Sequence, residues 1–249
     1  MMPIGDESHA RGGLPIVNLA IIAVNLAVFV LLQLPSDAFT MGFSAIPREI
    51  LTGTDLVGPV QVPLPDGTVE TLVEAPGPSP IWLTIVTSTF MHGGWAHLLG
   101  NMLFLYVFGD NVEAAFGSLL YLAFYMVAGV VASLAHVLFN ADSVIPSLGA
   151  SGAISGVLAG YLLLFPQNRV RVLVFFRIIP YTYTVPAFVM IGLWALFQLI
   201  NGFASITPSA ETSGVAYMAH VGGFVAGLIL TALLRPLVDR EPPRGFAPA

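Results

Sequence analysis

The chain has 249 residues, of which 56% are hydrophobic and only 9% are charged, with a formal net charge of -6. Soluble domains carry about 25% charged residues, so the composition excludes an ordinary soluble enzyme and indicates a membrane protein. Cysteine is absent, every basic residue is arginine and no basic cluster occurs. These features exclude a disulfide framework and a thiolate metal site, and we expect no nucleic-acid partner.

Six apolar segments predict membrane-spanning helices, because about 20 residues cross a bilayer. In chain order they cover residues 14–34, 97–116, 119–139, 151–165, 185–203 and 217–234. The fourth is short, but its Gly and Ala content suits a helix enclosed by others. The pattern predicts an all-α polytopic membrane protein, a six-transmembrane-helix bundle with a long first external loop.

The first segment has a second interpretation as a signal peptide, because Ser36-Asp37-Ala38 resembles a cleavage site. Its apolar run exceeds the usual signal core of about 7–15 residues, which favours an anchor. The loop that follows covers about residues 35–80 and includes the alternating stretch "VQVPLPDGTVETLV". This stretch predicts a small hairpin turning at Pro65-Asp66-Gly67. A loop of this length is typically functional or disordered.

The placement of arginine orients the bundle, because cytoplasmic loops carry an excess of basic residues. With both termini cytoplasmic, Arg48 alone lies outside. The arginines then placed inside are Arg11, Arg169, Arg171, Arg177, Arg235, Arg240 and Arg244. The predicted divisions are a cytoplasmic N-terminal tail (1–13), a six-span core (14–236) and a flexible cytoplasmic C-terminal tail (237–249). The expected location is a bacterial-type plasma membrane.

Polar residues at membrane depth are costly and often functional. The second span opens with "HGGWAHLLGN", in which His97 and Asn101 are four residues apart and share one helix face. His92 precedes the two glycines where the chain enters the helix. Taken alone, Asn101 is also typical of interhelical hydrogen bonding, and a lone histidine is as often structural as functional.

The fourth and sixth spans each carry small residues at every fourth position, a spacing that lets helices pack closely. They are Gly152, Gly156 and Gly160 in one span, and Ala219, Gly223 and Gly227 in the other. Ser151 lies between Gly149 and Gly152, and His220 lies next to Ala219. A packing seam alone would account for Ser151, and a hydrogen-bonding role would account for His220.

The depth of these residues favours a common site. The second, fourth and sixth spans all run from outside to inside, and the four polar residues lie in their first turns. Ser151 could serve as a nucleophile with His220 as its base. Asn101, His97 and the backbone N–H of Ser151 could hold an oxyanion. Without an acid at this depth, the arrangement predicts a Ser–His dyad. We expect neither metal nor cofactor.

Four stretches resemble the rhomboid intramembrane serine proteases: "GASG" around Ser151, "HGGWAHLLGN" from His92, "AHVGGFVAG" around His220 and "GNMLFLYVFGDNVEAAFG" from Gly100. The resemblance covers the six-span core. It implies a serine endopeptidase that cleaves single-span membrane proteins in or near their transmembrane segment, with membrane lipid as its other partner.

The same resemblance assigns roles to the matching positions. Ser151 and His220 would be catalytic, and His97 and Asn101 would stabilise the oxyanion. The residues expected to support the site structurally are His92, Gly149 and Gly152.

Two positions depart from the family pattern. Arg48 follows Pro47 where relatives often have a Trp-Arg pair, and Ser155 stands where some have an aromatic residue. Two other functions remain open. One is a catalytically inactive rhomboid-like protein that binds membrane clients, and the other is a small transporter or channel with a polar site at the bilayer midplane.

Overall fold

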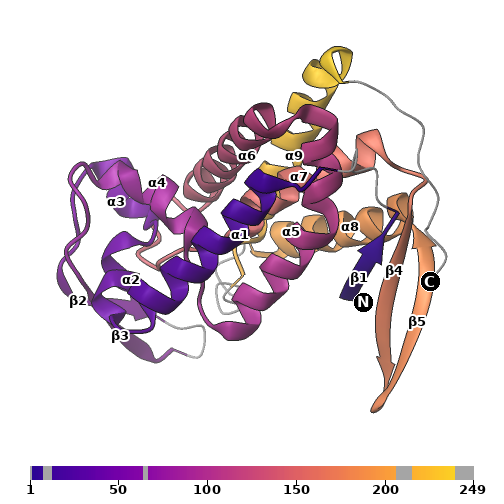
Figure 1. Cartoon of the computed structure of the whole chain (residues 1–249). Helices are drawn as coiled ribbons and strands as arrows, with labels where there is room; N and C mark the ends of the chain where they lie inside the picture. The colour runs from indigo at the N-terminus through magenta and orange to yellow at the C-terminus, as the bar shows by residue number, and fades with distance from the viewer. Residues whose placement is uncertain (1, 8–12, 64–66, 206–214, 239–249) are drawn as a thin grey trace.

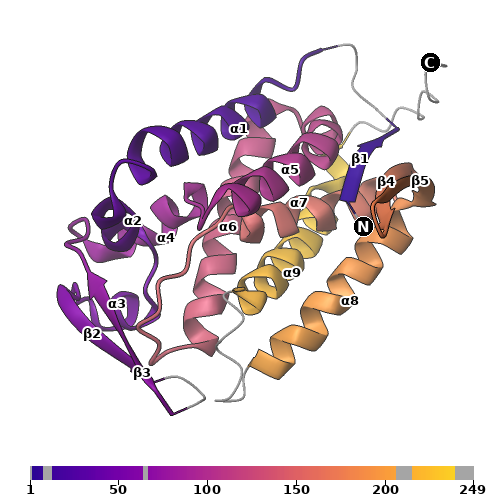
Figure 2. The ribbon, with the colours of Figure 1, turned by 90° about the horizontal axis from the view of Figure 1, so that it is seen from below.

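The computed structural model describes residues 2–7, 13–63, 67–205 and 215–238. The long helices are α1 (Ile16–Val28), α5 (Trp95–Phe116), α6 (Ser118–Phe139), α7 (Ser151–Leu164), α8 (Ala187–Ser205) and α9 (Tyr217–Leu234). A π-helical turn, Phe29–Gln33, continues α1. A 3-10 turn, Arg235–Leu237, continues α9. Together these helices form one bundle in which α7 is enclosed by its neighbours (Figures 1 and 2).

Four helical segments are long and apolar enough to cross a membrane, which identifies an integral membrane protein. They are Ile16–Gln33, Ser118–Phe139, Ala187–Ala204 and Tyr217–Leu237. The other two predicted spans also form helices at their expected positions, but they differ in character. Helix α5 carries Asp110 and Glu113 near its end, and α7 has only 14 residues.

Glycines bring α7 and α9 into backbone contact. A Cβ on Gly223 would collide with the carbonyl oxygen of Gly152, and a Cβ on Gly227 would collide with that of Gly156. On the α6 side, a Cβ on Gly156 would lie 2.5 Å from the Cβ of Ala128. The four-residue spacing read from the sequence therefore forms a contact seam, because only glycine leaves room for two backbones this close.

The all-α expectation needs correction, because the mostly helical chain also contains two small sheets. Strands β4 (Arg169–Phe176) and β5 (Ile179–Pro186) form a hairpin between α7 and α8, and β1 (Met2–Asp6) pairs with β4. The sequence of this hairpin is rich in Val, Phe, Tyr and Thr, which favour strands. Helix α8 consequently starts at Ala187, two residues later than the predicted span at 185.

The region predicted to be the first external loop is ordered wherever the structure describes it. The predicted hairpin is confirmed, because β2 (Gly58–Pro63) pairs antiparallel with β3 (Val69–Glu74). Of its predicted turn, Pro65 and Asp66 lie outside the described residues.

Short helices complete this region. They are α2 (Asp37–Phe43), α3 (Pro47–Thr52) and α4 (Thr84–Thr87), the last flanked by the 3-10 turns Ile81–Leu83 and Ser88–Phe90. Helices α2 and α3 have common capping residues. The hydroxyl of Ser36 accepts the N–H of Phe39, Pro47 opens α3 and Gly53 closes it in the left-handed conformation.

The N-terminal segment is tied to the end of the bundle that carries β4 and β5. The Asp6 carboxylate accepts hydrogen bonds from Asn111 Nδ2 (2.7 Å) and from the hydroxyl of Tyr161. The predicted tail at 1–13 thus includes a docked strand, with residues 8–12 outside the described part. Most of the predicted C-terminal tail, residues 239–249, also lies outside it.

Gly223→Ala is expected to separate α7 from α9, because the new Cβ meets the Gly152 carbonyl. Overpacking of this kind costs about 1–3 kcal/mol. The expected result is a lower midpoint of thermal unfolding and slower modification of Ser151 by a fluorophosphonate. The matched control is Gly192→Ala in α8, where a Cβ meets nothing within 4 Å. Equal behaviour of the two variants would contradict the seam.

Candidate active site

Ser151 is the first residue of α7, and the loop before it is held in place by Gly149. The backbone of Gly149 has φ 139°, a conformation that L side chains rarely adopt, and its N–H donates to the Ser88 carbonyl at 2.9 Å. A Cβ there would lie 2.9 Å from the His97 ring and 3.4 Å from Ser151 Oγ. Gly149 therefore leaves open the space between these two side chains.

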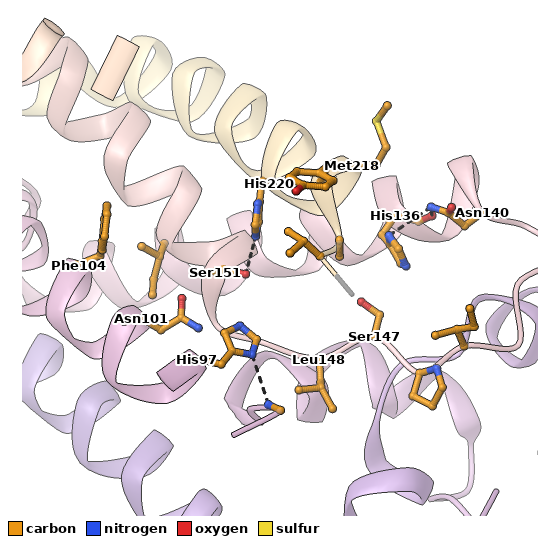
Figure 3. A pocket seen from close by; sticks show the side chains of 18 of the residues that line it. His97, Asn101, Phe104, His136, Asn140, Ser147, Leu148, Ser151, Met218 and His220 are labelled. Atoms are coloured by element: carbon orange, nitrogen blue, oxygen red, sulfur yellow. Dashed lines mark hydrogen bonds between the residues drawn. The ribbon is translucent and has the colours of Figure 1, made fainter. Parts of the chain in front are cut away.

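His220 in the first turn of α9 contacts Ser151 directly. Its Nε2 lies 2.7 Å from Ser151 Oγ, although the two residues are 69 positions apart in the sequence. Figure 3 shows the His220 ring pointing at the serine hydroxyl across the α7–α9 seam. The sequence-predicted nucleophile and base are thus in hydrogen-bond contact, the arrangement in which a histidine can take the serine proton.

Gln198 of α8 holds the other side of the His220 ring, a contact that the sequence did not predict. His220 Nδ1 lies 2.8 Å from Gln198 Oε1, and both side chains are buried. An amide oxygen only accepts, so Nδ1 carries the proton and Nε2 presents its lone pair to Ser151. The available signal was a glutamine inside an apolar span.

His97 and Asn101 of α5 face the same space from the opposite side (Figure 3). The Gly93 N–H donates to His97 Nδ1 at 3.3 Å, so the neutral ring carries its proton on Nε2, the nitrogen nearest the Gly149 gap. Asn101 Nδ2 is buried and has no hydrogen-bond partner within the described part of the chain. Both side chains therefore present donors that a reacting oxygen could use.

His92 lies behind this pair and outside the cavity lining. The backbone N–H of His92 donates to Gln33 Oε1 at 2.8 Å, and Gln33 Nε2 donates to the backbone carbonyl of His92 at 3.0 Å. Its buried ring meets the His97 ring edge-on, with centroids 5.2 Å apart. His92 thereby joins the end of the first span to the start of α5. Gly152, on the α6 side of α7, would place a Cβ 2.6 Å from that of Ala132.

A cavity of about 740 Å³ opens beside the dyad. Its wall includes Ser151, His220, His97 and Asn101. Two residues that the sequence reading did not single out, His136 and Asn140, come from the end of α6 and contact each other at 3.2 Å between Asn140 Nδ2 and His136 Nδ1. Further parts of the wall come from α5, from α7, from the loop before Ser151, from Trp194 and from residues 215–218. The volume suits an extended peptide segment or several waters.

Ser155 and Arg48, the two positions that depart from the family pattern, each have a local structural explanation. Ser155 is buried and donates to the Ser151 carbonyl at 2.6 Å, so it binds its own helix and not the His220 ring. That ring has Gln198 as a hydrogen-bond partner, and Trp194 lies 6.0 Å away between centroids. Arg48 donates its backbone N–H to the Ser143 carbonyl at 3.1 Å, which attaches the start of α3 to the loop before α7.

The site does not resemble a metal centre. Among the residues that the structure describes, no three His, Asp or Glu side chains come close enough to share an ion. Two of the nearby histidines have a ring nitrogen engaged in a hydrogen bond: Nε2 of His220 with Ser151, and Nδ1 of His97 with Gly93. Acyl transfer through Ser151 is the chemistry that these residues support together.

Comparison with known proteins gives a match to the Rhomboid domain family over residues 80–237. The mitochondrial Rhomboid protein 1 of Saccharomyces cerevisiae is 26% identical over 89% of this chain and 54% of its own length. The Rhomboid protease GluP of Bacillus subtilis is 34% identical over 61% of this chain and 26% of its own. The chloroplastic Rhomboid-like protein 11 of Arabidopsis thaliana is 32% identical over 62% and 53%. The chain thus spans about half, or less, of the length of these relatives.

Gln198→Leu is expected to slow modification of Ser151 by a fluorophosphonate roughly 5-fold, because a buried hydrogen bond contributes about 1 kcal/mol. If Gln198 positions the His220 ring, a charge at this position should also change the pH dependence of the modification. Gln198→Glu should restore the rate and move the acidic limb of the pH profile to higher pH, since a carboxylate favours the charged ring. Asn201→Leu on the same helix is the control. If neither Gln198→Leu nor Gln198→Glu changed the pH profile, Gln198 would have only a packing role.

Proposed function

Because the chain belongs to the rhomboid family, we propose that it is an intramembrane serine endopeptidase that uses a Ser151–His220 dyad. The observation that carries the proposal is the 2.7 Å contact between Ser151 Oγ and His220 Nε2. This contact lies beside a cavity, inside a bundle with membrane-spanning helices. The similarity to GluP, a protein named as a protease, supports the same activity.

The proposed reaction follows from the positions of these atoms. Ser151 Oγ attacks the peptide carbonyl while His220 Nε2 takes the hydroxyl proton. The oxygen that becomes negative is held by His97 Nε2–H, Asn101 Nδ2–H and the backbone N–H of Ser151. His220 then gives its proton to the leaving amine. Water hydrolyses the acyl-enzyme with His220 again as base.

The proposed arrangement in the membrane has six spans and both termini in the cytoplasm, in a bacterial-type plasma membrane. One support is that β1 pairs with β4, so the N-terminal segment lies at the same end as the loop between α7 and α8. The arginine distribution is another, because Arg169, Arg171 and Arg177 lie in that loop. The candidate site then opens toward the first external region, where water is available.

The proposed substrates are single-span membrane proteins, because these can approach the bundle sideways. A helix hides its carbonyls in its own hydrogen bonds, so a substrate must unwind before Ser151 can attack it. Lipid cannot satisfy the exposed backbone groups, whereas the polar wall around His97 and Asn101 can. Gly and Pro near the outer end of a substrate span lower the cost of unwinding, so such substrates should be cut faster.

Ser151→Ala and His220→Ala are each expected to abolish cleavage of a single-span reporter protein in liposomes, because each removes half of the dyad. The double variant should be no worse than either single one, since the two residues act as a unit. Unchanged thermal unfolding serves as the folding control. Turnover by purified Ser151→Ala would refute the assignment. A wild-type protein that binds the reporter but neither cuts it nor reacts with a fluorophosphonate would indicate the inactive, client-binding function.

Asn101→Ala is expected to be slow rather than inactive. Loss of one oxyanion donor costs about 10²–10³ in kcat, and the unpartnered Asn101 Nδ2 is positioned as such a donor. The loss should fall on kcat with little change in KM, because the donor acts on charge that develops in the transition state. An unchanged kcat would return Asn101 to the role of interhelical packing.

A further inference from the structure

The β4–β5 hairpin has one continuous apolar face. In its register Val172 lies opposite Tyr183, Val174 opposite Tyr181 and Phe176 opposite Ile179. Residues at alternate positions share a face of a sheet. This face, which we call the apolar hairpin face, consists of Val170, Val172, Val174, Phe176, Ile179, Tyr181, Tyr183 and Val185.

The two halves of the apolar hairpin face have different surroundings. At the base, Val170 and Val172 are fully buried in the core of the bundle. Toward the tip, Phe176 is 67% exposed and Ile179 opposite it is 53% exposed, and Ile178 in the turn is 90% exposed. The same side of the hairpin that meets the protein core thus continues outward with nothing covering it among the described residues. Exposed patches of this kind mark contact with a partner or a membrane.

The direction of the hairpin places this face beside the membrane. Strand β5 leads straight into α8, whose lipid-length segment exposes Leu193, Phe197 and Ile200. In Figure 1 the hairpin runs across the axis of α8 and its tip lies clear of the helices; in Figure 2 it is seen nearly end-on. Because α8 begins where the hairpin ends, a hairpin that runs across this axis extends along the bilayer surface and not straight out into water.

The charges of the hairpin fit phospholipid headgroups. Residues 167–186 include Arg169, Arg171 and Arg177 but no acidic residue. The side opposite the apolar hairpin face carries both strand arginines at its base, with Thr182 and Thr184 on β5, although Leu173 and Phe175 also lie there. Aromatic side chains over an apolar boundary, with arginines reaching the phosphates, are typical of segments lying in a membrane interface.

We propose that the β4–β5 hairpin is a membrane-contacting element, whose apolar hairpin face lies in the phospholipid headgroup boundary at the end of the bundle opposite Ser151. This contact is separate from the proposed catalysis. It would fix the depth and tilt of α7 and α8, the two helices that the hairpin connects. The β2–β3 hairpin at the other end offers an internal comparison, because it carries Glu70 and Glu74 and no aromatic residue.

The absence of cysteine makes the test direct, because one introduced cysteine gives one labelled position. Ile178→Cys and Val73→Cys, each carrying an environment-sensitive fluorophore, would be compared in the full-length protein in phospholipid nanodiscs holding one copy. Val73 is also largely exposed but lies on β3. The label at 178 should be quenched by lipids brominated near the headgroup. Its Stern–Volmer constant for aqueous iodide should be several-fold smaller than that of the label at 73.

A second variant tests the face itself. Phe176→Ser combined with Tyr181→Ser and Tyr183→Ser should make the label at 178 accessible to iodide, while modification of Ser151 by a fluorophosphonate shows that the bundle remains folded. Equal iodide access at positions 178 and 73 in the parent protein would overturn the proposal. So would protection that is absent in single-copy nanodiscs and grows with protein density in liposomes, since β5 is an edge strand and a second copy would then cover it.

Discussion

The contact between the backbones of α7 and α9 is the constraint on which the candidate site depends. Serine and histidine have short side chains, so Ser151 and His220 meet only if their helices nearly touch. Gly223 against the Gly152 carbonyl, and Gly227 against that of Gly156, allow this approach. In lipid, helices associate through such close packing because apolar burial gives them little advantage. The glycine seam and the dyad are therefore not alternative explanations of the same residues, since the seam creates the dyad's geometry.

The sequence predicted those parts that depend on local patterns. The span at 217–234 coincides with α9, and the fourth span begins with α7 at Ser151, because small residues and apolar runs mark helices directly. The helices α2 and α3 also carry local signals, Ser36 and Pro47, although no helix is predicted in this loop. Other features depend on distant partners. Strand β1 forms only because β4, more than 160 residues later, offers it an edge.

Some residues of the candidate site can likewise be predicted from local sequence patterns, whereas others depend on how distant helices pack. Ser151, His220, His97 and Asn101 lie in recognisable local patterns at a shared depth. Gln198 has no such pattern, because its role depends on which face α8 turns toward α9, and nothing in the spacing of the fifth span determines that rotation. His136 and Asn140 likewise reach the cavity only through the packing of α6. The sequence shows that Ser155 stands where some rhomboid proteins have an aromatic residue. It does not show that Gln198 contacts the His220 ring instead.

The length of α7 explains how the candidate site can lie within a membrane protein and still meet water. Its 14 residues extend about 21 Å at 1.5 Å per residue, whereas the hydrocarbon core is about 30 Å thick. A helix this short cannot reach both surfaces, and the β4–β5 hairpin and β1 attach its far end to the rest of the bundle. Ser151 at the other end must then lie below the opposite surface. The loop at 143–150 precedes Ser151, and the cavity of about 740 Å³ leaves room for water beside Ser151 and His220. The same shortness that buries the nucleophile thus leaves room for the water that the proposed reaction consumes.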